Sequence, residues 1–189
     1  MEINNDYKKG TEAFQQKNYQ QAFLCYKNAA EQGDAKLQFN LGLMYTDGVG
    51  VVRDLKQAVV WYTKAAEQGD VEAQFNVGLS YHQGIDVVQD LKQAADWYKK
   101  AADQGFVQAQ CNLGVLFQED GLARNYEKAL VWYKTAAEQG DACAQRNIAL
   151  MYIQGKGVDR NKLKAISWFI KSVYSVIKTS FKTPHRKGN

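Results

Sequence analysis

The stretch Ala-Ala-Glu-Gln-Gly-Asp at residues 29–34 decides the fold of this chain. Near copies of it recur along the sequence, at 65–70, 101–106 and 136–141. The copies are spaced by 36, 36 and 35 residues, a period that is typical of stacked helical modules and not of one globular core. We therefore expect a repeat array.

Each repeat reads as a pair of helices. Apolar residues recur at i, i+3 and i+4, and Asp54 stands where it can cap the second helix of its repeat, as do Asp90, Asn125 and Asn161 in theirs. The glycine of each copy sits where a helix end needs a left-handed residue. We expect an all-α protein, an α-solenoid of about five antiparallel helix pairs with an extended C-terminal helix.

The repeats also predict the domain organisation. The expected units are about 3–34, 35–70, 71–106, 107–141 and 142–176, within a single solenoid domain at 1–181. Residues 182–189 are expected to be a basic, disordered tail. Gly42, Gly78 and Gly114 fall inside the first helices, where we expect the helices of a pair to approach closely, backbone to backbone.

Four motifs of the second repeat carry a resemblance to a known family. They are Ala-Lys-Leu-Gln-Phe-Asn-Leu-Gly-Leu-Met-Tyr at 35–45, Asp-Gly-Val-Gly-Val at 47–51, Asp-Leu-Lys-Gln-Ala at 54–58 and Trp-Tyr-Thr-Lys-Ala-Ala-Glu-Gln-Gly at 61–69. Together they resemble the Sel1-like repeat, a tetratricopeptide-related family of helix pairs. The resemblance covers about 35–168, whereas 3–34 is more similar to a plain tetratricopeptide repeat. It implies a protein-binding scaffold with a concave groove lined by the first helices.

Charge and cysteine content narrow the function further. The net charge is +4, but every Asp and Glu lies at or before Asp159, so the body is mildly acidic and the end of the chain is basic. We therefore expect no nucleic-acid binding. Cys25, Cys111 and Cys143 lie on different repeats without a repeat-wise partner, so we expect three reduced thiols, no metal site and a cytoplasmic protein. Neither a signal peptide nor a membrane span is predicted.

Nothing in the sequence indicates catalysis. His82 is the one histidine within the repeats, and no nucleophile stands at a spacing that guarantees contact with it. The paired glycines at 48–50 and 155–157 follow no predicted strand, so we interpret them as turns and not as phosphate cradles. We expect no catalytic residue and no cofactor.

The candidate binding site is the variable face of the first helices. Positions that the architecture needs should repeat, and positions that vary are free to contact a ligand. In the tetratricopeptide relatives this face lines the groove. The predicted groove residues are Tyr7, Thr11, Lys36, Phe39, Asn40, Leu43, Glu72, Phe75, Asn76, Leu79, His82, Gln108, Cys111, Gln118 and Arg146. We expect Phe39 and Phe75 to be exposed there, although some of the apolar positions could instead be buried between repeats.

The expected partner is another protein or a peptide segment. The main alternative is a membrane-peripheral scaffold, because the last helix is basic and amphipathic. Its expected apolar face is Ile166, Phe169, Val173, Ile177 and Phe181, with Lys164, Lys171 and Lys178 on another face. This helix is either a cap on the preceding repeat or a contact for a second subunit, an acidic partner or an anionic membrane. A hydrolase or small-ligand-binding protein is a further alternative, and the oligomeric state is left open.

Overall fold

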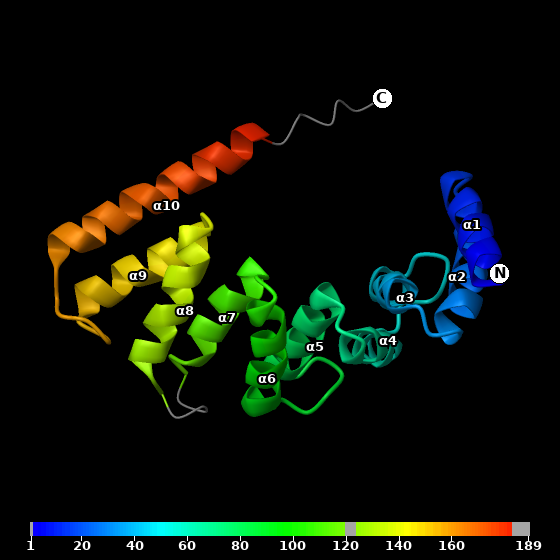
Figure 1. The fold of residues 1–189 in the computed structure, drawn as a ribbon, viewed down its shortest axis with the longest axis horizontal. Helices are drawn as coiled ribbons and strands as arrows, with labels where there is room; N and C mark the ends of the chain where they lie inside the picture. The colour runs from blue at the N-terminus through cyan, green and yellow to red at the C-terminus, as the bar shows by residue number, and fades with distance from the viewer. Residues whose placement is uncertain (1, 120–123, 183–189) are drawn as a thin grey trace. The chain divides into compact units, whose positions relative to one another are not determined.

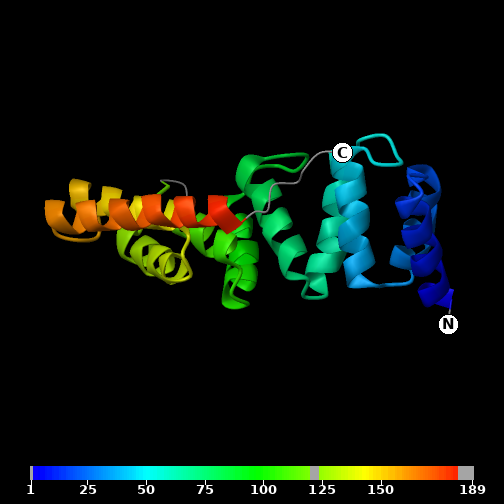
Figure 2. The same ribbon diagram turned by 90° about the horizontal axis from the view of Figure 1, so that it is seen from above.

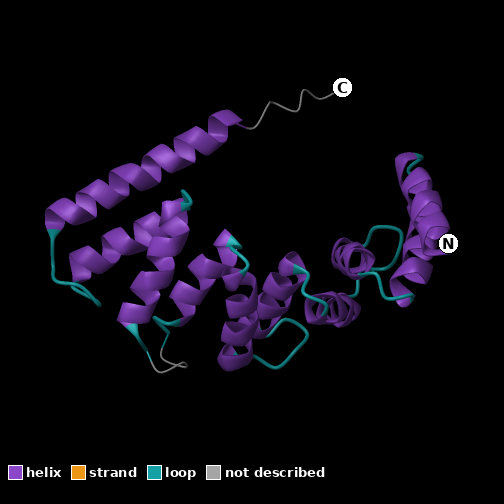
Figure 3. Ribbon diagram, viewed as in Figure 1, coloured by secondary structure: helices purple, strands orange, loops and turns teal. Residues whose placement is uncertain are grey.

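The computed structural model describes residues 2–119 and 124–182, and every regular element in those ranges is an α-helix (Figure 3). The helices are α1 (Glu2–Gln15), α2 (Tyr19–Glu31), α3 (Ala35–Asp47), α4 (Leu55–Glu67), α5 (Val71–Gln83), α6 (Leu91–Asp103), α7 (Val107–Leu116), α8 (Tyr126–Glu138), α9 (Ala142–Gln154) and α10 (Lys162–Lys182). The predicted all-α class and the five helix pairs are confirmed. No helix in the described ranges is long and apolar enough to cross a bilayer.

The helices pair in sequence order into hairpins. The chain forms two compact units, 1–104 and 105–189, each of which is described by itself. The first contains the hairpins α1/α2, α3/α4 and α5/α6, and the second contains α7/α8 and α9/α10 (Figures 1 and 2). Within each unit, the second helix of one hairpin also packs against the first helix of the next.

Short polar side chains begin the helices. The Asp54 carboxylate accepts a hydrogen bond from the Gln57 amide at 3.0 Å, and Asp90, Asn125 and Asn161 accept equivalent bonds. Asp34, Asp70 and Asp141 cap the first helices of their repeats in the same way. Each of these side chains satisfies an amide that the helix itself cannot pair. The predicted caps at Asp54, Asp90, Asn125 and Asn161 are therefore confirmed, and the caps of the first helices are an additional finding.

The mid-helix glycines make room for tyrosine rings. A Cβ built on Gly78 would lie 2.7 Å from Cδ1 of Tyr98, a fully buried side chain on the paired helix. Gly42 and Gly114 are equally close to Tyr62 and Tyr133. The close approach is thus glycine to aromatic ring, and the expectation of backbone-to-backbone contact was wrong.

Buried glutamines join neighbouring helices. Gln38 lies in the first turn of α3, where its Nε2 donates to the carbonyl of Ala30 at 3.1 Å and its Oε1 accepts from Nε2 of Gln68 at 2.7 Å. Gln74 makes the same pair of bonds, with Ala66 and Gln104. One amide therefore ties together three successive helices. Gln110 likewise accepts from Gln139, at 2.8 Å.

The last helix does not pack as expected. Ala165 and Ser172 are buried against α9, and the Ser172 hydroxyl donates to the carbonyl of Ala142 at 2.9 Å. The cap alternative placed Ile166, Val173 and Ile177 against the preceding repeat, yet each of these residues is about half exposed. The side chain of Phe181 and residues 183–189 lie outside the described part of the chain. So α10 caps the second unit through its small residues and leaves an apolar face open.

Candidate binding surface on the first helices of the repeats

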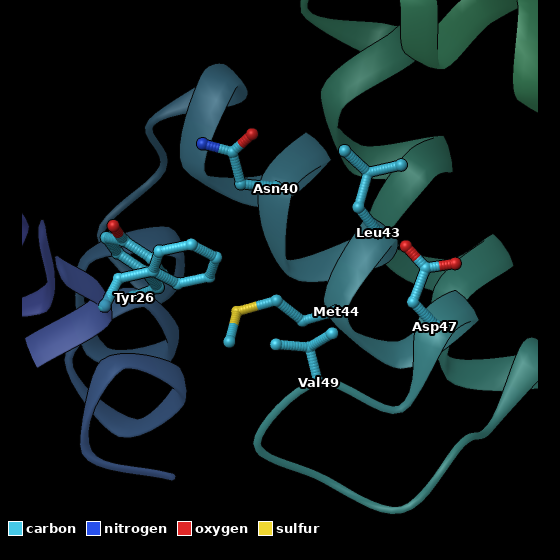
Figure 4. Close-up of a pocket in the computed structure, with 7 residues that line it drawn as sticks. Tyr26, Asn40, Leu43, Met44, Asp47 and Val49 are labelled. Carbon is cyan, nitrogen blue, oxygen red and sulfur yellow. The ribbon is translucent and has the colours of Figure 1, made fainter. Parts of the chain in front are cut away.

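A pocket of about 310 Å³ opens in the first unit, between its first three helices (Figure 4). Its lining residues come from α1, α2, α3 and the loop after α3: Phe14, Tyr26, Asn40, Leu43, Met44, Asp47 and Val49. The two predicted residues among them are Asn40 and Leu43, so the predicted face does contribute to a real depression.

Local structure explains why the pocket is there. Gly48 and Gly50 follow α3 with positive φ angles of 71° and 72°, so the chain turns back sharply. Gly50 lies so close to the Tyr19 carbonyl that a side chain would not fit between them. This turn places Val49 beside Met44, opposite Tyr26 of α2 (Figure 4). The glycines therefore shape a turn, as their sequence context indicated.

The pocket combines apolar walls with a polar rim. Phe14 and Leu43 are partly exposed to solvent, whereas Met44 is buried at the base of the pocket. The carboxylate of Asp47 is exposed, and the amide of Asn40 is half-buried. Such a site can take an apolar side chain and orient it with a few polar contacts. It offers no pair of groups arranged for acid–base or nucleophilic chemistry.

The predicted groove aromatics are not exposed anchors. Phe39 is buried in the core, where it packs against Tyr62 with ring centroids 5.7 Å apart. Phe75 is half-buried and packs against Tyr98 at the same separation. The expectation that both would be exposed was wrong for Phe39, which belongs to a buried cluster with Tyr62 and with Ala73 and Val77 of the next repeat.

Several residues of the variable face have a structural partner. Gln118 Nε2 donates to the Tyr133 hydroxyl at 2.6 Å, and His82 Nδ1 lies 3.4 Å from the Tyr98 hydroxyl. Thr46 holds the same position in its repeat and contacts Tyr62, whereas Thr11 contacts Tyr26 from a different repeat position. In the last repeat this position is Ile153, and the tyrosine is replaced by Phe169, which has no hydroxyl. The variation at this repeat position is therefore explained in part by contacts with the second helix of the same hairpin.

Burial and these hydrogen bonds shift the pKa values of the tyrosine hydroxyls. Burial raises the pKa of Tyr62, while the hydrogen bond with Thr46 lowers it and the nearby Asp47 raises it. Burial also raises the pKa of Tyr133 well above its usual range. Both hydroxyls therefore stay protonated at neutral pH and act as hydrogen-bonding groups in the hairpins.

The remaining predicted residues lie at different depths. Tyr7, Lys36, Glu72, Gln108 and Arg146 are exposed, Asn76 and Leu79 are half-buried, and Cys111 is buried. The pocket residues missed by the sequence interpretation are Phe14, Tyr26, Met44, Asp47 and Val49. Tyr26 and Val49 lie outside the first helices, so a search restricted to one helix face could not find them.

Two cysteines meet in the second unit. Cys111 on α7 and Cys143 in the first turn of α9 share a side-chain hydrogen bond, and their sulfurs lie within 4.8 Å of each other and of an Asp141 carboxylate oxygen. The two cysteines are therefore neighbours in space although they do not occupy equivalent repeat positions, and the sequence did not predict this contact. All three cysteines are free thiols in this structure.

We assign no metal to this cluster. Nη2 of Arg146 lies 4.0 Å from Sγ of Cys143, and Nδ2 of Asn147 lies 3.9 Å from it. A guanidinium at that distance opposes a bound cation and favours an anion. The surroundings of Cys143 therefore suit a thiolate.

The sequence matches a known repeat family along most of its length. The Sel1 repeat pattern matches five segments that together span most of the chain, at 7–34, 35–70, 71–106, 107–141 and 144–174. The chain belongs to the Sel1 repeat family. The match at 7–34 makes the first repeat a Sel1 repeat as well, so its assignment to plain tetratricopeptide repeats was wrong.

Solved structures agree with this assignment. A Sel1 repeat protein from Oxalobacter formigenes is 34% identical, with a TM-score of 0.79 over 82% of this chain and 65% of that one. A protective antigen of uropathogenic Escherichia coli strains, which displays the same fold, is 39% identical, with a TM-score of 0.75 over 84% of this chain and 35% of that one. The chain thus spans less than two thirds of either relative. No curated protein matches its sequence significantly.

Proposed function

We propose that this Sel1 repeat protein is a non-enzymatic scaffold that binds a segment of another protein on the first helices of its repeats. The observation that carries the proposal is the pocket formed by α1, α2 and α3. Repeat proteins of this type generally use such surfaces for recognition, and function here comes from the site and not from the fold.

The lining suggests what the partner segment contains. An apolar side chain such as leucine or phenylalanine would fill the space between Phe14, Leu43 and Met44. A lysine or arginine next to this side chain would form an ion pair with the exposed carboxylate of Asp47. The amide of Asn40 can form a hydrogen bond with a peptide group. The expected ligand is therefore a peptide with an apolar anchor flanked by a cation.

Selection from a random peptide library on the immobilised full chain tests this. We expect enrichment of peptides with the apolar–basic pattern, and loss of their binding by at least tenfold in Leu43→Asp, which places a charge in the pocket. Leu24→Asp is the matched control, because Leu24 is more exposed than Leu43, lies on α2 and does not line the pocket. If Leu43→Asp binds the selected peptides as well as Leu24→Asp does, the pocket is not the site.

A second candidate function rests on the exposed face of α10. Ile166, Ile170 and Val173 are 54%, 64% and 58% exposed, and no acidic residue follows Asp159 in the sequence. Basic amphipathic helices of this kind bind anionic lipid surfaces in the interfacial plane. Flotation with vesicles containing phosphatidylserine tests this candidate. Binding to those vesicles that is lost in Ile170→Glu would support it, and equal flotation with neutral vesicles would contradict it.

A further inference from the structure

The surroundings of Cys143 are those of a reactive thiol. Cys143 is the second residue of α9 and is exposed, so it lies in the first turn of the helix, where the helix dipole favours a negative charge. The Cys111 thiol hydrogen-bonds to it from α7, while the side chains of Arg146 and Asn147 approach it from α9. All of these groups present hydrogen toward the sulfur and so stabilise a negative charge on it.

The ionisation of the pair agrees with this geometry. The hydrogen bond from Cys111 lowers the pKa of Cys143 to about 6, with a smaller contribution from Arg146, against burial and the nearby Asp141. The same bond, followed by burial, raises the pKa of Cys111. One thiolate and one thiol therefore share the site at neutral pH.

We propose that Cys143 and Cys111 form a thiol–disulfide exchange site, in which exposed Cys143 attacks a small-molecule disulfide and buried Cys111 resolves the product. This inference goes beyond the scaffold function and does not depend on which partner the pocket binds. It assigns different roles to the two sulfurs because only one of them is accessible.

The reaction has two balanced steps. The thiolate of Cys143 attacks one sulfur of a disulfide RSSR, the S–S bond breaks, and RS⁻ leaves and takes up a proton. Cys111 then loses its proton and attacks Sγ of Cys143, which forms the Cys111–Cys143 bond and releases a second RS⁻, protonated to RSH. Overall, the two cysteines lose two electrons and RSSR is reduced to two RSH.

The first step of the reaction makes the Cys111 thiol easier to deprotonate for the second step. The largest cause of the raised pKa of Cys111 is its hydrogen bond with Cys143, which depends on the charge of the Cys143 thiolate. That charge disappears when Cys143 becomes part of a mixed disulfide, so Cys111 becomes easier to deprotonate. The attacking sulfur of Cys111 lies within 4.8 Å of the Cys143 sulfur before the reaction begins, so the two reacting atoms are already neighbours.

Cys25 provides an internal control. It is buried on α2 in the first unit, where the amide of Gln21 donates to its sulfur at 3.5 Å. It has neither the exposure of Cys143 nor a second thiol beside it in the described part of the chain. We therefore expect Cys25 to remain a thiol while the other two react.

The test is oxidation of the folded full chain with glutathione disulfide without oxygen, followed by intact mass and peptide mapping. We expect a loss of about 2 Da, which is the mass of two hydrogens, and a peptide pair linked by Cys111–Cys143. Cys111→Ser should stop at one glutathione adduct on Cys143, Cys143→Ser should not react, and Cys25→Ser should behave as the unmodified chain. A stable adduct without the internal bond, or a linkage between chains, would overturn the assignment.

Labelling of the unmodified chain keeps the proposal testable if the serine variants fail to fold. Cys143 should react with iodoacetamide at pH 6 about tenfold faster than in a peptide of residues 138–148, because its larger thiolate fraction outweighs its lower nucleophilicity. The titratable groups that face it are Cys111 from α7, Tyr133 from α8, and Asp141 and Arg146 near its own helix end. Equal rates in chain and peptide would show that the site does not activate Cys143.

Discussion

Gln68 donates a hydrogen bond from its side-chain amide to Oε1 of Gln38, and the two atoms are 2.7 Å apart. Gln68 follows α4 directly and Gln38 lies in the first turn of α3, so the bond closes the end of one hairpin. Gln38 is buried. Without the Gln68 donor, its side-chain oxygen would lose its hydrogen bonds to water on folding and would gain no hydrogen bond in their place.

Removing that donor should destabilise the protein measurably. Gln68→Ala is expected to lower the free energy of unfolding by about 1–3 kcal/mol, because it leaves the Gln38 oxygen buried and unpaired. Urea denaturation measures the change. Gln32 holds the equivalent place after α2, and among the described residues its side-chain amide donates to the carbonyl of Asn28 on the surface of its own helix, so Gln32→Ala should stay within about 0.5 kcal/mol of the unmodified chain. Equal losses in both variants would refute this role for Gln68.

The last repeat lacks this donor, and restoring it should stabilise the protein. Oε1 of Gln145 is buried without a hydrogen-bond partner among the described residues, and Ser175 stands where earlier repeats have Gln68, Gln104 and Gln139. Ser175→Gln should raise the free energy of unfolding by about 1 kcal/mol. Ser175→Ala is the control and should bring no such gain. A thermal melt with no upward shift for Ser175→Gln would mean that its amide does not reach Gln145.

A methyl group at the glycine–tyrosine contact should cost stability despite better helix propensity. In Gly78→Ala the new Cβ would lie 2.7 Å from Cδ1 of the Tyr98 ring, which is fully buried. The propensity gain is about 1 kcal/mol, and overpacking costs about 1–3 kcal/mol, so we expect a net loss. Circular dichroism during urea titration reports it.

Ala149 supplies the comparison for that variant. It occupies the glycine position of the last repeat, opposite Phe169. Ala149→Gly should lose stability through propensity alone, by about 1 kcal/mol. If Gly78→Ala proves more stable than the unmodified chain, the ring moves more easily than the packing indicates.

The open face of α10 should tolerate polar substitutions. Ile170 is 64% exposed and Ile177 is 48% exposed, so Ile170→Gln and Ile177→Gln should each change the free energy of unfolding by less than about 0.5 kcal/mol. Deleting residues 172–189 should instead lower the melting temperature, because it removes the Ser172 bond to Ala142 and uncovers α9. A large loss from the two glutamine substitutions would show that this face is covered in solution.

Phe39 shows which structural features could be predicted from the sequence and which could not. Its repeat position, its helix and the glycine turn after that helix were predicted from local chemistry, whereas the Asp34 cap was not predicted. Its burial depends on Tyr62 of the next helix, which fills the space beside Gly42. The recurrence of glycine and tyrosine was visible in the sequence, but their contact required the geometry of the hairpin.

The contact between Cys111 and Cys143 could not be predicted from the sequence for a related reason. Cys111 and Cys143 occupy different positions within their repeats, so a comparison of equivalent positions does not connect them. Their contact arises because the first helices of successive repeats lie side by side in the second unit. The pocket at Met44 was missed similarly, since Tyr26 and Val49 reach it from a second helix and a loop.

The glutamine bonds also bear on how such a chain can change length during evolution. Gln38 and Gln74 each reach only their own hairpin and the helix just before it. An in-frame duplication or deletion of one whole 36-residue period would thus join each amide to a chemically identical neighbour. A recombination event that is out of phase with the period would leave buried amides without partners, so selection should favour gains and losses of complete repeats.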